Sequence, residues 1–145
     1  MNKVDEIKTV ADVLYEKKLI NSDQLAAIKF ESVNTGKSVE SIIKDRGYVK
    51  SEDYAQAFGE VYGIGFANPG SGQINQELFE KIGLNIAKKY RVFPLELNGN
   101  ALSLAMIDPL DLQTIDFIER RTGYKVIPFI TTEKIMERVL DEQKG

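Results

Sequence analysis

The stretch TVADVLYEKKLINSDQLAAIKFES, residues 9–32, decides the first half of the fold because a related stretch follows it. Shifted by 29 residues, it overlays SVESIIKDRGYVKSEDYAQAFGEV, residues 38–61. The shared positions are mostly apolar, as where Val10 matches Val39. Within each copy the apolar residues recur three and four positions apart, which is typical of amphipathic helices. We therefore expect a tandem repeat in which each copy is helix, short apolar turn, helix.

The polar residues between these apolar positions mark where the helices begin and end. Asn21-Ser22 with Gln24 forms a capping-box pattern, and Ser51 precedes two acidic residues. The five residues VNTGK (33–37) are expected to join the copies. Gly36 is expected to end a helix with a positive φ angle, followed by a solvated Lys37.

The joining segment also contains Gly36-Lys37-Ser38, which resembles the end of a phosphate-binding P-loop. Such a loop needs another glycine five positions earlier and a strand leading into it. Glu31 occupies the earlier position, and the preceding residues favour a helix. The sequence therefore predicts an interhelical turn without nucleotide hydrolysis.

A glycine-rich stretch separates this repeat from the rest of the chain. Five glycines and Pro69 lie within residues 59–72, which predicts a boundary or an accessible loop. We expect a helical tandem-repeat lobe over 1–65 and an α+β lobe with a small mixed sheet over 66–145.

The second lobe is expected to have the order β-β-α-β-α after two short helices. The expected elements are helices at 76–83 and 84–90, two β runs within 91–107, a helix at 108–123, a strand at 124–130 and a helix at 131–143 with a threonine cap. Asn98-Gly99 is a strong hairpin signal. Asp108 is expected to be the N-cap of the following helix, with Pro109 at its first position, Asp111 at its third and Gly123 at its end.

Composition excludes several classes of chemistry. The chain has no His and no Cys, which excludes thiolate nucleophiles, His-based triads and zinc sites built from these residues. The net charge is −3, and neither half has the basic excess that nucleic-acid binding requires. No membrane span or signal-peptide core is visible, so we expect a cytoplasmic protein that does not insert into a membrane. No catalytic residue, metal or cofactor is expected.

The run AKKYRVFPLELNGNALSLAMIDPLDLQTIDFIERRTGYKVIPFI (87–130), together with the tandem motifs, resembles a known family. The family is the N-terminal domain of type II secretion and type IV pilus assembly ATPases, of the GspE or MshE type. The resemblance implies a non-catalytic docking or regulatory domain that contacts inner-membrane platform proteins and its own ATPase domain. In full-length members it precedes a hexameric motor. This chain is too short to hold that motor, so we expect an excised domain or a stand-alone copy.

Part of that family uses the paired motifs to bind cyclic di-GMP. In those members each motif opens with Arg-Leu-Gly, has Gly at its tenth position and ends with Gln. Here the matching residues are Thr9 and Ser38 for Arg, Val10 and Val39 for Leu, Ala11 and Glu40 for the first Gly, Lys18 and Gly47 for the tenth position, and Ser32 and Val61 for Gln. Arg and Gln would supply hydrogen bonds to guanine and phosphate. We therefore expect no ligand binding at Thr9, Lys18, Ser32, Ser38, Gly47 or Val61.

Two other hypotheses remain. One is a cyclic di-GMP sensor with a diverged motif, and the other is a small stand-alone enzyme that uses carboxylates. The lost Arg and Gln residues count against the sensor. The absence of His, Cys and any paired-acid motif counts against the enzyme.

Overall fold

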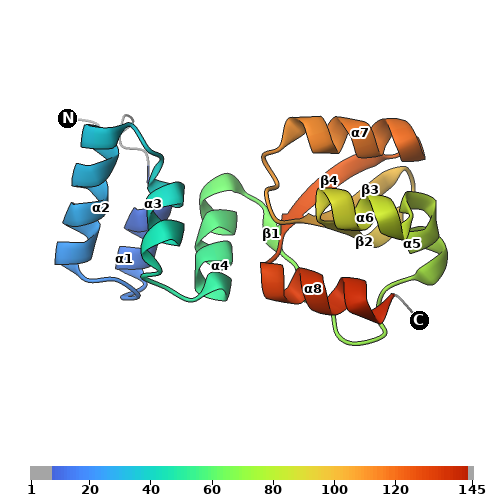
Figure 1. Ribbon diagram of the computed structural model, residues 1–145, viewed down its shortest axis with the longest axis horizontal. Helices are drawn as coiled ribbons and strands as arrows, with labels where there is room; N and C mark the ends of the chain where they lie inside the picture. The colour runs from blue at the N-terminus through green and yellow to red at the C-terminus, as the bar shows by residue number, and fades with distance from the viewer. Residues whose placement is uncertain (1–7, 144–145) are drawn as a thin grey trace. The chain divides into compact units, whose positions relative to one another are not determined.

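The computed structural model describes residues 8–143, and the chain forms two compact units, Met1–Gly63 and Ile64–Gly145. Four helices make up the described part of the first unit (Figure 1): α1 (Val10–Glu16), α2 (Ser22–Thr35), α3 (Val39–Arg46) and α4 (Ser51–Tyr62). This is the predicted pair of helical hairpins.

The helix starts follow the polar pattern. The backbone N–H of Gln24 donates to Asn21 Oδ1 at 2.8 Å, and the N–H of Asn21 donates to Gln24 Oε1 at 2.9 Å, so the predicted capping box is confirmed. Helix α4 begins at Ser51 as expected, but its N-cap is Lys50, whose side chain makes no capping hydrogen bond.

The connection between the copies is shorter than predicted. Helix α2 continues to Thr35, and Gly36 ends it with φ 77°. Asn34 Nδ2 donates to the carbonyl of Phe30 at 2.9 Å, and Thr35 Oγ1 donates to that of Glu31 at 2.7 Å. These side chains bond back to the preceding turn instead of ending the helix. The prediction that 33–37 form the joint is wrong for Val33–Thr35 and correct for Gly36.

The core of the first unit comes from the shared apolar positions. Its fully buried side chains include Val10, Leu14, Ile28, Ile42 and Ile43. Helix α1 packs on α2, α3 and α4, so it is the central element of this unit. The repeat therefore buries one continuous apolar surface.

A four-stranded sheet forms the centre of the second unit. It contains β1 (Gly65–Phe66), β2 (Val92–Asn98), β3 (Ala101–Met106) and β4 (Lys125–Ile130), in the order β1-β4-β3-β2. β2 and β3 form the predicted antiparallel hairpin, whereas β4 is parallel to both β3 and β1. Strand β1 was not predicted, because two residues in a glycine-rich stretch cannot show alternation.

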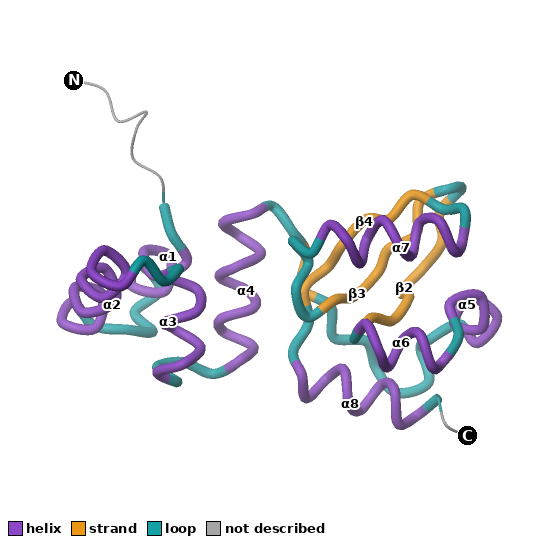
Figure 2. Tube along the Cα trace, turned by 45° about the horizontal axis from the view of Figure 1, so that its top comes forward, coloured by secondary structure: helices purple, strands orange, loops and turns teal. Residues whose placement is uncertain are grey.

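Helices cover this sheet (Figure 2). They are α5 (Gln76–Ile82), α6 (Leu84–Tyr90), α7 (Leu112–Thr122) and α8 (Glu133–Glu142). Helix α7 packs on β4, while α5, α6 and α8 pack on β2. The expected α+β class is confirmed, and Thr132 caps α8 as the sequence predicts.

The start of α7 differs from the prediction. Asp111, not Asp108, is the N-cap, and its carboxylate accepts from the N–H of Thr114 at 3.2 Å. Asp108 instead accepts from the N–H of Leu110 at 3.2 Å, and its carbonyl accepts from the N–H of Asp111 at 3.1 Å. Pro109 therefore lies in a tight turn before the helix, a position that its fixed φ suits equally well. Gly123 ends α7 with φ 80°, as predicted.

The glycine-rich stretch is less open than expected. Gly59 is buried within α4, Gly65 lies in β1, and Ala67 is only 5% exposed. Gly63 and Gly65 are exposed, and residues 68–73 form a mostly exposed loop in which the carbonyl of Pro69 accepts from Arg138 of α8 at 2.7 Å. The expectation of an accessible segment therefore holds for 68–72 and for Gly63 and Gly65, but not for Gly59 or Ala67.

Among residues 8–143, no helix is both long enough and apolar enough to span a bilayer. The expectation about an export signal rests partly on residues 1–7, which lie outside the described part of the chain.

Candidate functional site

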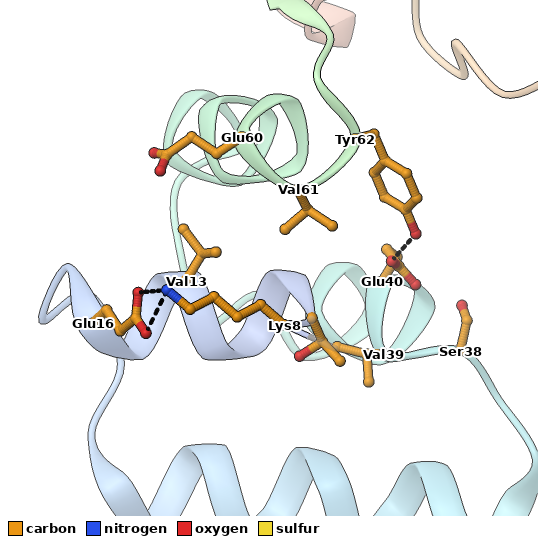
Figure 3. A pocket seen from close by; sticks show the side chains of 10 residues that line it. Lys8, Val13, Glu16, Ser38, Val39, Glu40, Glu60, Val61 and Tyr62 are labelled. Carbon is orange, nitrogen blue, oxygen red and sulfur yellow. Dashed lines mark hydrogen bonds and ion pairs between the residues drawn. The ribbon is translucent and has the colours of Figure 1, made fainter. Parts of the chain in front are cut away.

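A groove of about 650 Å³ lies within the first unit, where the two repeats begin and α4 ends (Figure 3). Its lining residues are Lys8, Thr9, Val13 and Glu16 at the first repeat, Ser38, Val39 and Glu40 at the second, and Glu60, Val61 and Tyr62 of α4. The side chains of Val13 and Val61 point toward each other across its floor. The helical hairpins thus bring together segments that are far apart in the sequence.

Of the six motif positions at which we expect no ligand binding, three line this groove. Thr9 and Ser38, the opening positions of the two copies, both line it, as does Val61, the closing position of the second copy. Lys18, Ser32 and Gly47 do not. Ser32 Oγ instead donates to the carbonyl of Lys37 at 2.8 Å and so holds the end of α2. The groove is therefore built unequally from the two copies.

The two opening residues cap their own helices. The N–H of Asp12 donates to Thr9 Oγ1 at 3.2 Å, and Thr9 Oγ1 donates to Asp12 Oδ2 at 3.1 Å. The N–H of Ser41 donates to Ser38 Oγ at 3.1 Å. Both hydroxyls already hold helix N-termini, and neither side chain is long enough to replace an arginine.

The tenth positions share one backbone conformation. Lys18 has φ 65° and Gly47 has φ 64°, so both are left-handed. Glycine adopts this conformation without strain, whereas a residue with a Cβ does not. The two copies thus have the same backbone bend at this position, although only the second has a glycine there.

The charges at the groove are mainly acidic. Lys8 Nζ lies 3.0 Å from a carboxylate oxygen of Glu16, and Lys17 Nζ lies 2.6 Å from Glu60 Oε2. Tyr62 OH donates to Glu40 Oε2 at 2.8 Å. That hydrogen bond, followed by partial burial and the Glu40 charge, raises the pKa of Tyr62 above its usual value. Glu16 and Glu60 are thus paired with lysines, whereas the partner of Glu40 is the hydroxyl of Tyr62.

Some lining residues were not predicted. Tyr62 is 42% exposed and donates to Glu40, whereas Tyr54 and Phe58 of the same helix are 7% and 6% exposed. Its place directly after the second motif is the signal that could have identified it. Glu60 could have been identified in the same way, since it directly precedes Val61.

The P-loop resemblance is a turn, as predicted. Gly36 ends α2, Ser38 caps α3, and the carboxylate of Glu31 binds Arg46 at 2.8 Å. The lead-in is α2 rather than a strand. Within residues 8–143, no three acidic side chains gather in a way that could hold a metal ion.

Comparison with known proteins gives the family. The MshEN domain model matches residues 62–143, which is more than half of the chain. The type IV pilus assembly ATPase PilB of Myxococcus xanthus (strain DK1622) is 20% identical over 132 residues, covering 91% of this chain and 23% of PilB. PilB of Acinetobacter baylyi (strain ATCC 33305 / BD413 / ADP1) is 31% identical over 87 residues, covering 57% of this chain and 15% of that protein. The chain thus spans less than a quarter of these curated relatives.

Two solved structures have the same fold. MshE with cdg superposes with a TM-score of 0.72 at 18% identity, covering 94% of this chain and 99% of that one. The N-terminal domain of XpsE superposes with a TM-score of 0.59 at 15% identity, covering 94% of each chain. The chain therefore belongs to the MshEN domain family and has the fold of the N-terminal domains of MshE and XpsE.

Proposed function

We propose that this chain is a non-catalytic docking and regulatory domain of a bacterial secretion or pilus assembly ATPase. It acts through contacts with platform proteins of the inner membrane and with the ATPase domain that it serves. Family membership supports this, as does the similarity to a small part of much longer ATPases. In this proposal the domain transmits a binding event and performs no chemistry.

The composition of the groove is the observation that carries the proposal. Each cyclic di-GMP molecule has two phosphate charges, and the groove offers Glu40 where binding members have a glycine. The hydroxyls of Thr9 and Ser38 are used within α1 and α3. A domain that keeps its fold but lacks the donors for the dinucleotide retains its surfaces for protein contacts.

A cyclic di-GMP sensor is the second candidate. The similarity to MshE with cdg over 94% of this chain favours it, and so does the meeting of both motif openings at one groove. The family match begins at Tyr62, so most of the groove lies before the matched residues. Sensor function would require the ligand to be bound without the arginines and glutamines of the family motif.

The docking proposal is tested by titrating the protein with the cytoplasmic domain of an inner-membrane platform protein from the secretion or pilus system of the same organism, by calorimetry, with and without cyclic di-GMP. The proposal expects saturable binding whose affinity the dinucleotide does not change. Failure to bind the platform domain would contradict docking. Binding that appears only with the dinucleotide would establish the sensor instead.

A further inference from the structure

The turn that joins β2 to β3 holds an exposed asparagine directly before a glycine. Strand β2 ends at Asn98, β3 begins at Ala101, and these two residues pair in the antiparallel register. Gly99 and Asn100 therefore form the loop, and Asn98 is exposed. In an Asn-Gly pair the backbone nitrogen of the glycine can attack the side-chain carbonyl carbon of the asparagine, because no Cβ hinders its approach.

Both reacting groups are available in the folded chain. Within residues 8–143, the structure shows no hydrogen bond for the side-chain amide of Asn98 and none for the N–H of Gly99. A Cβ added at Gly99 would meet no atom within 4 Å, so the space around this residue is open. The nucleophilic nitrogen and the carbon that it attacks are thus both accessible.

The other asparagines within residues 8–143 lack this combination. Three side chains are already hydrogen-bonded to the backbone of a helix, namely those of Asn21, Asn34 and Asn75. Asn68 precedes a proline, whose nitrogen carries no proton. Asn85 and Asn100 each precede a residue that has a Cβ and lies within α6 or β3. The structure therefore distinguishes Asn98 from all of them.

The position of β2 in the sheet allows the turn to open. Attack requires the backbone at Asn98 to leave its extended conformation. In the order β1-β4-β3-β2 this strand lies at the edge and pairs with β3 alone, and its register shifts between Pro94 and Glu96. Turns and chain segments with few partners open locally at a fraction of the free energy of global unfolding. The end of the hairpin can therefore reach the reactive geometry while the rest of the sheet stays folded.

We infer that Asn98 is a site of non-enzymatic deamidation, in which Gly99 supplies the nucleophile and water is the co-reactant. The Gly99 nitrogen forms a bond to Cγ of Asn98, and the side-chain amide leaves as ammonia with the proton of that nitrogen. Water then adds to one or the other carbonyl carbon of the cyclic imide, breaks its bond to the Gly99 nitrogen and returns a proton to it. Opening at Cγ gives aspartate, and opening at the main-chain carbonyl carbon gives isoaspartate. Asparagine is among the thermolabile residues of proteins.

The isoaspartate product changes the end of the sheet. Its main chain runs through the side-chain carbon and is longer by a methylene group. The carbonyl of Asn100, in the same turn, accepts from the N–H of Lys125 at 2.9 Å and so holds the start of β4. A longer connection alters the spacing on which both the hairpin and this contact depend. This inference goes beyond the docking function and does not rest on it.

Mass spectrometry of the whole chain, incubated at physiological temperature and mildly alkaline pH, tests the site. Trypsin releases residues 92–120 as one peptide, and its fragmentation separates a change at Asn98 from one at Asn100. Asn98 should be converted before any other asparagine within residues 8–143, with isoaspartate among the products. Asn98→Ser should abolish this conversion, whereas Asn100→Ser, the same change at the neighbouring exposed position, should leave it unchanged. Circular dichroism establishes that both variants stay folded.

A synthetic peptide of residues 95–102 is the reference for the reaction without the fold. Asn98 of the folded chain should be measurably converted by the time the peptide has reacted completely. Intact Asn98 in the folded chain at that point would overturn the inference, because the hairpin would then protect the site. Earlier conversion of another asparagine within residues 8–143, or an unchanged mass gain of the 92–120 peptide in Asn98→Ser, would overturn it as well.

Discussion

Lys18 has the left-handed backbone that its counterpart in the second copy of the repeat also has. It has φ 65° at the position where the second copy has Gly47. A left-handed conformation costs a residue with a Cβ about 1–2 kcal/mol. Lys18→Gly should therefore raise the free energy of unfolding by about 1 kcal/mol, after the greater entropy of glycine in the unfolded chain is subtracted. Urea denaturation measures this. Gly47→Ala is the matched control and should lower the same free energy by about 1 kcal/mol.

Asp12 gives the first unit a pH dependence. Burial alone would raise its pKa, but hydrogen bonds from Lys29 and from the backbone and hydroxyl of Thr9 outweigh burial and lower it below 3.8. A lowered pKa contributes stability above pH 3.8, and that stability is lost as the pH falls through the lowered value. Asp12→Asn should therefore cost about 1 kcal/mol at pH 7, and the difference should shrink below pH 3.8. Urea denaturation at pH 7 and pH 3 measures both.

Glu137→Gln is the control: at an exposed position of α8, it should change stability little at either pH. A deficit for Asp12→Asn that persists unchanged at pH 3 would contradict this.

Strand β1 depends on the absence of a side chain at Gly65. A Cβ at this position would lie 2.6 Å from the ring of Phe129 on β4. Gly65→Ala should therefore destabilise the protein by about 1–3 kcal/mol. Thermal unfolding measures the loss, with Phe129→Ala as the second arm of a double-mutant cycle. In the Phe129→Ala background, Gly65→Ala should cost clearly less, because the clashing ring is gone. Equal costs in both backgrounds would show that the contact is not the cause.

The elements that the sequence predicts best are those with a strong local signal. The β2–β3 hairpin follows from Asn98-Gly99, and the start of α8 follows from Thr132. Strand β1 could not be predicted, because its pairing with β4 joins residues more than 60 positions apart. The sequence could not show that Asp111, and not Asp108, is the N-cap of α7. Both carboxylates precede the helix, and either could accept from a backbone N–H of its first turn. The groove was not predicted either. The motif positions indicate which residues could bind a ligand, but they do not show that Glu16 and Tyr62 lie beside them in the fold.

The turn between α2 and α3 bears on whether this chain can hydrolyse ATP. Glu31 is bound to Arg46, and Gly36-Lys37-Ser38 forms a helix end and a helix start instead of a phosphate cradle. The purified chain with magnesium and ATP should therefore release phosphate only at the background rate. Lys37→Ala is the control, because in a true P-loop this lysine contacts the β- and γ-phosphates. Turnover above background that disappears in Lys37→Ala would contradict the account.

The chain has the family fold, and our proposal is that the residues at its cyclic di-GMP motif positions no longer suit that ligand. In the docking proposal, Thr9, Ser38, Ser32 and Val61 would each fail to supply a charge-assisted hydrogen bond worth about 1.5–3 kcal/mol. The absence of these bonds would weaken a micromolar complex to beyond about millimolar. A variant with Arg at 9 and 38, Gln at 32 and 61, and Gly at 11, 18 and 40 should regain affinity, since the backbone at Lys18 already has the conformation of Gly47.

Calorimetric titration of the unmodified chain with cyclic di-GMP separates a docking domain from a sensor most directly. We predict no heat of binding up to about 1 mM ligand, and measurable heat for the variant with the restored motif. A micromolar dissociation constant for the unmodified chain would contradict the account and establish the groove as a dinucleotide sensor.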